Sequence, residues 1–124
     1  MEQAARTSGI VVVHKGRRCF VPAEVAREIV PRPVISRVPG TPLGMALVSG
    51  RVVPVIDLGD DRRQLLVCDL DGEFVAIAGL DVVEAGFFEA DPDGVRDGAQ
   101  RIPMLDVAAE IRRAQAELLS GAAP

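Results

Sequence analysis

The sequence predicts a mainly β fold that ends in one helix, and three observations predict it. Short runs of Val, Ile and Leu alternate with turn-forming Gly, Pro and Asp along most of the chain. Two stretches resemble each other, which indicates one β-rich unit built twice. The C-terminal stretch instead carries its apolar residues at helical spacing. With 124 residues, 48% of them hydrophobic, the chain has room for one domain with a substantial core, or for two very small modules that share a core.

The first strands are expected in residues 9–22, where two β-rich runs flank a Lys-Gly-Arg-Arg turn. Residues 22–30 open with Pro22 and carry Glu24 early, so we expect a short helix or helical turn that ends at Pro31.

The middle of the chain is expected to contain a second hairpin. Residues 31–44 are rich in proline, which a central strand excludes, so they are expected to be an extended connection. Residues 45–48 and 52–56 are expected to be strands joined by a tight turn at Ser49 and Gly50.

The second half of the chain continues in the same style. Its expected elements are a polar turn at 57–63, a hairpin at 64–79 with Asp71-Gly72 at its tip, a strand at 80–88, a loop at 89–100 and a short strand at 101–105.

The C-terminal residues 106–121 predict an amphipathic helix that packs on the domain. Asp106 is available as its N-cap and Gly121 as its end. The apolar stripe consists of Val107, Ala108, Ile111, Ala114, Leu118 and Leu119.

The internal similarity has two parts. Gly16, Val21 and Glu28 recur 56 positions later as Gly72, Ile77 and Glu84, and the segment 51–58, RVVPVIDL, resembles 101–107, RIPMLDV. In the second part, Asp57 and Asp106 occupy equivalent positions where a strand stops. We therefore expect both carboxylates to accept backbone N–H groups of the following turn or helix.

Composition excludes several classes of function. Aromatic residues make up only 3% of the chain and the net charge is −4, which argues against a nucleic-acid-binding surface. The apolar runs are too short to cross a membrane and no signal peptide opens the chain, so we expect a cytoplasmic protein without membrane insertion. Residues 1–8 are expected to be flexible. Cys19 and Cys68 are expected to be reduced, buried thiols, with a disulfide or a metal pair as the alternative.

No catalytic or metal-binding constellation is evident, so we expect no enzymatic activity and no cofactor. Asp57 and Asp106 could mimic an aspartic-protease pair, but Leu58 stands where that loop needs a hydroxyl. His14 is the single histidine, and a nucleophile pair with Cys19 would lack an orienting partner. The DPDG and DLDG segments lack the later Glu of a calcium loop and are expected to be turns.

Three segments, in this order, resemble the CheW family of adaptor proteins, which couple bacterial chemoreceptors to their histidine kinase. Residues 24–42 are similar to the family's Glu-Val-rich segment and Pro-rich connection. Residues 44–58, GMALVSGRVVPVIDL, are similar to its motif Gly-Val-Val-Asn-Leu-Arg-Gly-x-Val-Val-Pro-Val-Val-Asp-Leu. Residues 71–86 are similar to a stretch built around Gly-Leu-x-Val-Asp-x-Val-x-Glu-Val.

The resemblance implies two intertwined, SH3-like, five-stranded β-barrels in a domain over residues 9–111, followed by the C-terminal helix. It also implies no catalysis. Family members bind the tip of a chemoreceptor helical hairpin in a groove between the barrels, and bind a CheA-type histidine kinase through barrel ends. Matched residue by residue, the partner-binding positions are Ala26, Glu28, Gly44, Leu47, Ser49 and Gly50.

The chain departs from the family at two of these positions. Leu47 and Ser49 replace the Asn and Arg of the motif, so the hydrogen-bonding fork of that Arg is absent at position 49. We therefore expect kinase binding to be weakened relative to receptor binding. The chain is also shorter than a usual member, mostly between the Asp57 turn and the next strand and around residues 86–100. It therefore resembles a trimmed, divergent coupling protein, such as the second coupling protein of a Frz-type gliding-reversal system.

Two other functions are consistent with the sequence. The chain could be a repurposed stand-alone β-barrel that binds a small ligand or regulates an unrelated enzyme, as the loss of the Asn and Arg would allow. An enzyme is the third alternative, and a broad hydrolase screen with an Asp57→Asn control would reveal it.

Overall fold

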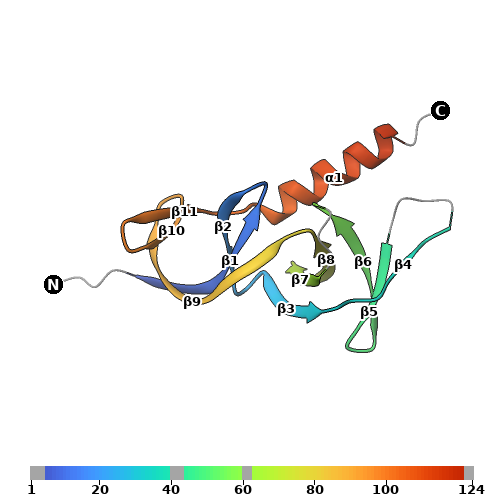
Figure 1. The fold of residues 1–124 in the computed structure, drawn as a ribbon, viewed down its shortest axis with the longest axis horizontal. Helices are drawn as coiled ribbons and strands as arrows, with labels where there is room; N and C mark the ends of the chain where they lie inside the picture. Colours follow the sequence, from blue (N-terminus) through green and yellow to red (C-terminus); the bar gives the residue numbers. More distant parts are fainter. Residues whose placement is uncertain (1–4, 40–43, 60–62, 122–124) are drawn as a thin grey trace.

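The computed structural model describes residues 5–39, 44–59 and 63–121, and the side chains of the last helix as far as residue 116. These residues form two curled β-sheets and one C-terminal helix (Figure 1). The elements are β1 (Arg6–His14), β2 (Arg17–Pro22), β3 (Ala26–Pro31), β4 (Ile35–Arg37), β5 (Gly44–Val48), β6 (Arg51–Asp57), β7 (Gln64–Leu70), β8 (Glu73–Ala78), β9 (Asp81–Asp91), β10 (Gly94–Asp97), β11 (Gln100–Pro103) and α1 (Val107–Gly121).

The two halves of the chain are intertwined, as predicted. One sheet has five strands in the order β11-β10-β9-β1-β2, and the other has six in the order β3-β7-β8-β6-β5-β4. Each sheet therefore combines strands from the first half of the chain, β1–β6, with strands from the second half, β7–β11. The five-stranded sheet takes β1 and β2 from the first half, and the six-stranded sheet takes β7 and β8 from the second.

The internal similarity corresponds to a repeated pairing. In the six-stranded sheet, β6 runs parallel to β8, with Val55 opposite Ala76. In the five-stranded sheet, Phe20 of β2 forms a parallel bridge with Met104, just after β11, and the Leu105 N–H donates to the Phe20 carbonyl at 2.9 Å. Phe20 and Ala76 are equivalent positions, as are Met104 and Val55. The same parallel contact thus joins the Pro-containing strand to the neighbouring hairpin in both sheets.

The three predicted hairpins are confirmed, and all three have two-residue turns with positive φ. The φ angles are 53° and 75° at Lys15-Gly16, 48° and 79° at Ser49-Gly50, and 54° and 91° at Asp71-Gly72. Positive φ at both positions defines the type I′ turn, whose twist matches that of the flanking strands.

The short helix or helical turn expected at residues 22–30 is wrong beyond its first residues. Only one turn forms there, with the Val25 N–H donating to the Pro22 carbonyl at 2.9 Å, and β3 then pairs antiparallel with β7. The β-branched Ile29 and Val30 suit this strand, and pairing across the sheet overrides the helix-start signal of Pro22. Strand β3 also has a bulge between Ala26 and Glu28.

Two other expectations need correction. The Pro-rich connection contributes β4, an edge strand beside β5, so this sheet has six strands and not five. An edge position is where proline-flanked strands are tolerated. Residues 89–100 are not a loop, because β9 continues to Asp91 and β10 follows. The exposed Glu89 and Asp97 lie on the solvent side of the sheet, and polar residues at such positions made the segment resemble a loop in sequence.

The chain start and the polar turn after β6 are only partly described. Strand β1 begins at Arg6, which pairs with Glu89 of β9, three residues before the domain start expected at residue 9. Residues 1–4 lie outside the described residues, as do 60–62 of the turn expected at 57–63. The division into a flexible 1–8, a domain over 9–111 and a helix over 106–121 stays a prediction.

The core has three parts. Each sheet encloses its own cluster, around Phe20 and Phe88 in the five-stranded sheet and around Leu65 and Ala76 in the six-stranded one. The third and largest cluster joins both sheets to α1 through residues that include Ile10, Val12, Ile56, Leu66, Ile77, Leu105 and Ile111. Strand β1 supplies Val11 to one cluster and Ile10 and Val12 to another, which explains its continuous apolar run.

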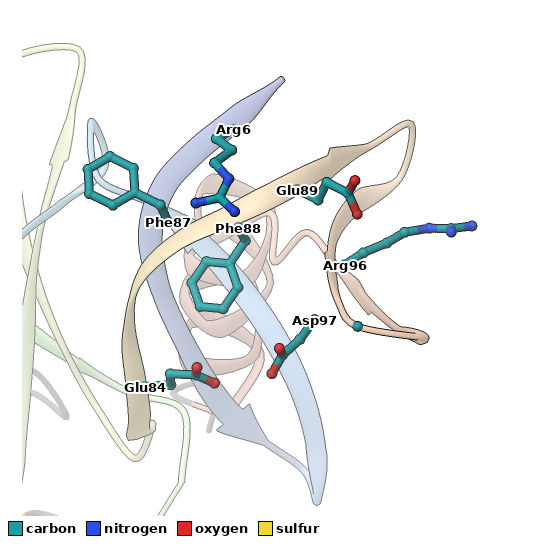
Figure 2. A pocket seen from close by; sticks show the side chains of 8 residues that line it. Arg6, Glu84, Phe87, Phe88, Glu89, Arg96 and Asp97 are labelled. Carbon is teal, nitrogen blue, oxygen red and sulfur yellow. The ribbon is translucent and has the colours of Figure 1, made fainter. Parts of the chain in front are cut away.

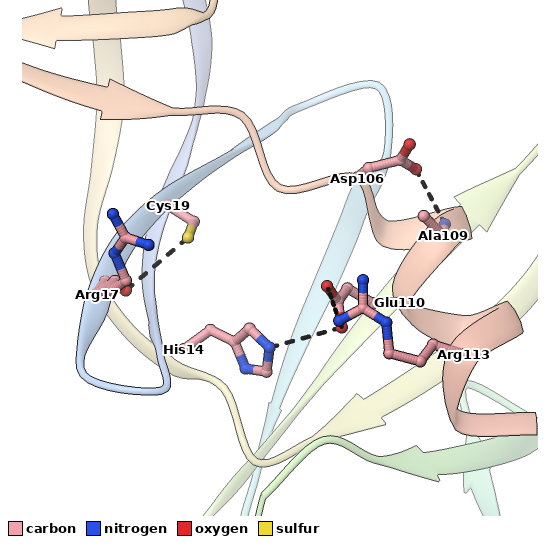
Figure 3. Close-up of polar contacts among 7 residues, drawn as sticks. All are labelled: His14, Arg17, Cys19, Asp106, Ala109, Glu110 and Arg113. Carbon is pink, nitrogen blue, oxygen red and sulfur yellow. Dashed lines mark hydrogen bonds and ion pairs between the residues drawn. The ribbon is translucent and has the colours of Figure 1, made fainter. Parts of the chain in front are cut away.

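The C-terminal helix begins as predicted. The Asp106 carboxylate accepts the Ala109 N–H at 3.0 Å, which is N-cap geometry (Figure 3). Val107 and Ile111 are buried and Ala114 packs against the same cluster. On its first turns α1 also carries Glu110, which lies 3.6 Å from His14 Nε2 and 3.2 Å from Arg113 Nη1. The side chains of Leu118 and Leu119 lie outside the described part. No helix in the described residues is long and apolar enough to cross a membrane.

Candidate interaction site

The six predicted partner-binding positions lie on two elements of the six-stranded sheet. Ala26 and Glu28 are on β3, Gly44 and Leu47 on β5, and Ser49 and Gly50 form the turn between β5 and β6. The two elements are separated by the β4 segment in sequence. Their partner-binding role stays a prediction, but the structure shows which of them meet.

Glu28 of β3 and Ser49 of the β5–β6 turn are in contact. The Ser49 hydroxyl donates to Glu28 Oε2 at 3.4 Å, and both residues are exposed. The contact joins β3 to the tip of the β5–β6 hairpin, although the two strands are not neighbours in the sheet. Two of the six predicted positions thus form one hydrogen-bonded polar pair on the surface.

Leu47 lies beside this polar pair and faces solvent. Its side chain is 71% exposed, and its cross-strand partner Val52 is 64% exposed. Together they form an apolar pair on the outer face of the hairpin. Exposed apolar side chains that lie side by side are typical of protein–protein contact sites.

Ala26 and Gly44 have evident roles in packing. Ala26 packs against the largest core cluster, which joins both sheets to α1. A Cβ on Gly44 would lie 2.9 Å from Ile35 Cγ2, so the absence of a side chain lets β4 approach β5. Gly44 is also at the opposite end of β5 from Ser49, and the structure does not bring these two positions together.

Three residues that the sequence did not indicate complete the site. The guanidinium of Arg51 lies 5.0 Å from the centre of the Phe74 ring, and that of Arg27 lies 5.7 Å from it. Both distances are within cation–π range. The residues come from β6, β3 and β8, so only the assembled sheet joins them, and no local sequence signal could have found them.

We call this group the Phe74 site, defined by Arg27, Arg51 and Phe74 with Glu28 and Ser49. The five residues line a pocket of about 330 Å³ at one end of the curled sheet. Its floor consists of the buried residues Val48, Val53 and Val67. A second, more apolar groove of about 490 Å³ shares Val48 with this pocket. Its lining residues include Val30, Val34, Met45, Leu47 and Leu65.

A pocket of about 850 Å³ lies on the five-stranded sheet (Figure 2). None of the six predicted positions lines it. Phe87 and Phe88 point to opposite sides of β9, and Phe87 is 72% exposed whereas Phe88 is buried. The rim has mixed charge, and Arg96 is paired with Asp91 at 3.2 Å.

The potential nucleophiles are not in an activating environment. Burial raises the pKa of the Cys68 thiol to about 12. It also raises the pKa of Cys19, against the opposing effect of Arg17 and with a smaller contribution from Glu110. His14 Nε2 lies near Glu110, while the Cys19 thiol points to the Arg17 carbonyl at 3.9 Å (Figure 3). Both cysteines are free, and no group of three or more His, Cys, Asp or Glu in the described residues could hold a metal ion.

Among solved structures, the chain is similar to the scaffolding protein TtCheW from Thermoanaerobacter tengcongensis. The two share 16% sequence identity with a TM-score of 0.58, and the match covers 73% of this chain and 66% of TtCheW, slightly less than two thirds of it. No protein-family model and no curated protein sequence matches the chain. The chain therefore has a CheW-like fold, with intertwined sheets as the sequence resemblance implied.

Proposed function

We propose that the protein is a non-enzymatic adaptor of a bacterial chemosensory array that works in the cytoplasm. It binds the cytoplasmic hairpin of a chemoreceptor, and it binds a CheA-type histidine kinase more weakly. It needs no cofactor, and its partners include neither nucleic acid nor a membrane. The observation that carries the proposal is an exposed apolar pair, Leu47 and Val52, on the β5–β6 hairpin of a CheW-like fold.

Receptor binding would depend on apolar burial. An amphipathic receptor helix would cover Leu47 and Val52 and could extend toward the apolar groove beside them. Glu28 and Ser49 would lie at the polar edge of this contact. The TtCheW likeness supports a scaffold role, because that protein is described as a scaffolding protein.

Weaker kinase binding would follow from Ser49. A charge-assisted hydrogen bond to a guanidinium typically contributes about 1.5–3 kcal/mol, and a serine hydroxyl cannot replace its fork. Such a loss corresponds to a tenfold to hundredfold drop in affinity. The assignment to a Frz-type system rests on the shortened segments after Asp57 and around residues 86–100 and on the departures from the motif at Leu47 and Ser49, and it stays a prediction.

A pull-down with the cytoplasmic hairpins of the source organism's chemoreceptors tests the proposal. Retention of the protein on at least one hairpin is expected. Binding to none of the hairpins would contradict the adaptor function.

Weak kinase binding is tested by calorimetry with the kinase regulatory domain. The double variant Ser49→Arg/Leu47→Asn should bind this domain at least about tenfold more tightly than the unaltered protein. Unaltered protein that binds kinase as tightly as the organism's ordinary coupling protein would refute the ranking.

A stand-alone barrel that binds a small ligand is the second candidate. The pocket of about 850 Å³ on the five-stranded sheet favours it, because none of the six predicted positions lines that pocket. Chemoreceptor and kinase genes beside this gene would favour the adaptor, and their absence would favour the small-ligand protein.

A further inference from the structure

The Phe74 site has an unusual electrostatic arrangement. Two guanidinium groups from distant strands lie over one aromatic ring, at 5.0 and 5.7 Å from its centre. In the described part of the chain, neither Arg27 nor Arg51 forms an ion pair with a carboxylate. Two positive charges thus line one pocket, and neither is paired with a carboxylate in the part of the chain that the structure describes.

The geometry points to a binding site for one glutamate side chain of a protein partner. We propose that this carboxylate binds between Arg27 and Arg51, and that its methylene groups pack on Phe74 and the valine floor. The proposal rests on the adaptor function only in that the glutamate belongs to a protein partner. Arg27, Arg51 and Phe74 are outside the six positions that the family resemblance indicated.

Net charge favours a single carboxylate. Arg27 and Arg51 contribute two positive charges, and Glu28, which lines the same pocket, contributes one negative charge. One carboxylate would neutralise the remaining charge of the site. A phosphate dianion would leave it negative and would lie close to the Glu28 carboxylate.

The ring provides preorganisation. A guanidinium that stacks on an aromatic face is restricted before the ligand arrives, so less side-chain entropy is lost on binding. Its planar fork matches the two oxygens of a carboxylate. The buried residues Val48, Val53 and Val67 offer an apolar floor for aliphatic carbons.

The site also restores a positive charge near position 49. Ser49 lines the same pocket as both arginines, and Arg51 is two residues further along the hairpin. The chain thus places guanidinium groups next to the position where the motif's Arg is missing. Arg27 and Arg51 belong to β3 and β6 and not to the turn itself, so the glutamate they bind need not be the group that the missing Arg would contact.

The test uses the full-length protein and NMR of arginine Nε–Hε groups. The probe is N-acetyl-glutamate N-methylamide, with the glutamine analogue as the matched neutral probe and inorganic phosphate as a third. The Nε–Hε signals of Arg27 and Arg51 should shift saturably with the glutamate probe, and more weakly or not at all with the other two. Unchanged signals, equal shifts with the glutamine probe, or tighter binding of phosphate would each overturn the proposal.

Variants separate charge from preorganisation. Arg51→Gln should weaken binding of the glutamate probe at least about tenfold. Phe74→Leu retains both charges and should weaken it by a smaller factor, with folding checked by circular dichroism. Arg101→Gln, an exposed arginine on the other sheet, is the matched control and should have no effect. If Arg51→Gln and Arg101→Gln lose the same affinity for the glutamate probe, the probe responds only to the net charge of the protein, and the proposed site is refuted.

The same variants distinguish this proposal from the adaptor function. If no receptor hairpin or kinase domain binds while the glutamate probe does, the adaptor function fails and the site remains. If a partner binds the unaltered protein and the Arg27→Gln/Arg51→Gln double variant equally well, the adaptor function remains and the glutamate contact is refuted.

Discussion

Asp106 connects the last strand to the helix through one side chain. Its carboxylate accepts the Ala109 N–H at 3.0 Å. Asp106→Ala should therefore lower the free energy of unfolding by about 1 kcal/mol, measured as a lower urea midpoint. Asp106→Asn keeps the acceptor oxygen and should retain most of that stability. Equal losses in both variants would show that charge, and not capping, makes the contribution.

Asp57 is the equivalent residue at the end of β6, and its capping role stays a prediction. Asp57→Ala should cost on the order of 1 kcal/mol of stability and leave partner binding intact. If stability is unchanged while binding to the receptor hairpin disappears, Asp57 belongs to a contact surface.

The buried thiol of Cys68 should make the free energy of unfolding depend on pH in the alkaline range. Burial raises the pKa of its thiol from 9.0 to about 12, so the folded protein keeps a proton that the unfolded chain loses between these values. The contribution is complete below pH 9 and falls as the pH rises toward 12, by up to about 1.4 kcal/mol per pH unit. Urea titrations across this range should show a flatter profile for Cys68→Ala. Parallel profiles for the two proteins would contradict the assignment.

At the scale of elements, the parallel pairing of β6 and β8 depends on two glycines. A Cβ on Gly79 would lie 2.2 Å from the Gly59 nitrogen, and Gly79 has a φ of 96°. Gly72 has a similar φ of 91° but nothing within 4 Å of its virtual Cβ. Gly72→Ala should cost roughly 1–2 kcal/mol from backbone strain alone. Gly79→Ala should cost at least about 2 kcal/mol more, because backbone must move. Similar urea midpoints for both variants would contradict this close approach.

The elements that the sequence predicted best are those with local signals. The turns at Lys15-Gly16, Ser49-Gly50 and Asp71-Gly72 carry their conformational preference in two residues, and the Asp106 cap acts within one helical turn. Strand β3 was missed because its pairing with β7 comes from residues about 40 positions away. Strand β10 was missed because its polar face resembles a loop.

The candidate site divides in the same way. The resemblance named Glu28 and Ser49 as partner-binding positions, which stays a prediction, and it did not predict the hydrogen bond that joins them. Arg27, Arg51 and Phe74 come together only when β3, β6 and β8 are assembled, so their contact could not be inferred from spacing.

At the scale of the whole molecule, the two halves depend on each other for folding. Each sheet needs strands from both sides of the β6–β7 connection, and the largest core cluster joins both sheets to α1. Fragments 1–60 and 61–124 should each be largely unfolded alone by circular dichroism, and mixing them should restore β structure. The intact chain should unfold in one cooperative transition. A fragment that folds stably by itself would contradict this interdependence.

Calorimetric titration of a receptor hairpin into Leu47→Asp protein tests most directly whether the β5–β6 hairpin face binds a chemoreceptor helix, as proposed. Leu47 is 71% exposed, so the variant should keep its stability within about 0.5 kcal/mol. The matched control is Phe87→Asp, which changes a 72% exposed side chain on the other sheet. We expect Leu47→Asp to weaken binding at least about tenfold and Phe87→Asp to leave it unchanged. Undiminished binding by Leu47→Asp would show that the receptor helix does not cover this face of the hairpin.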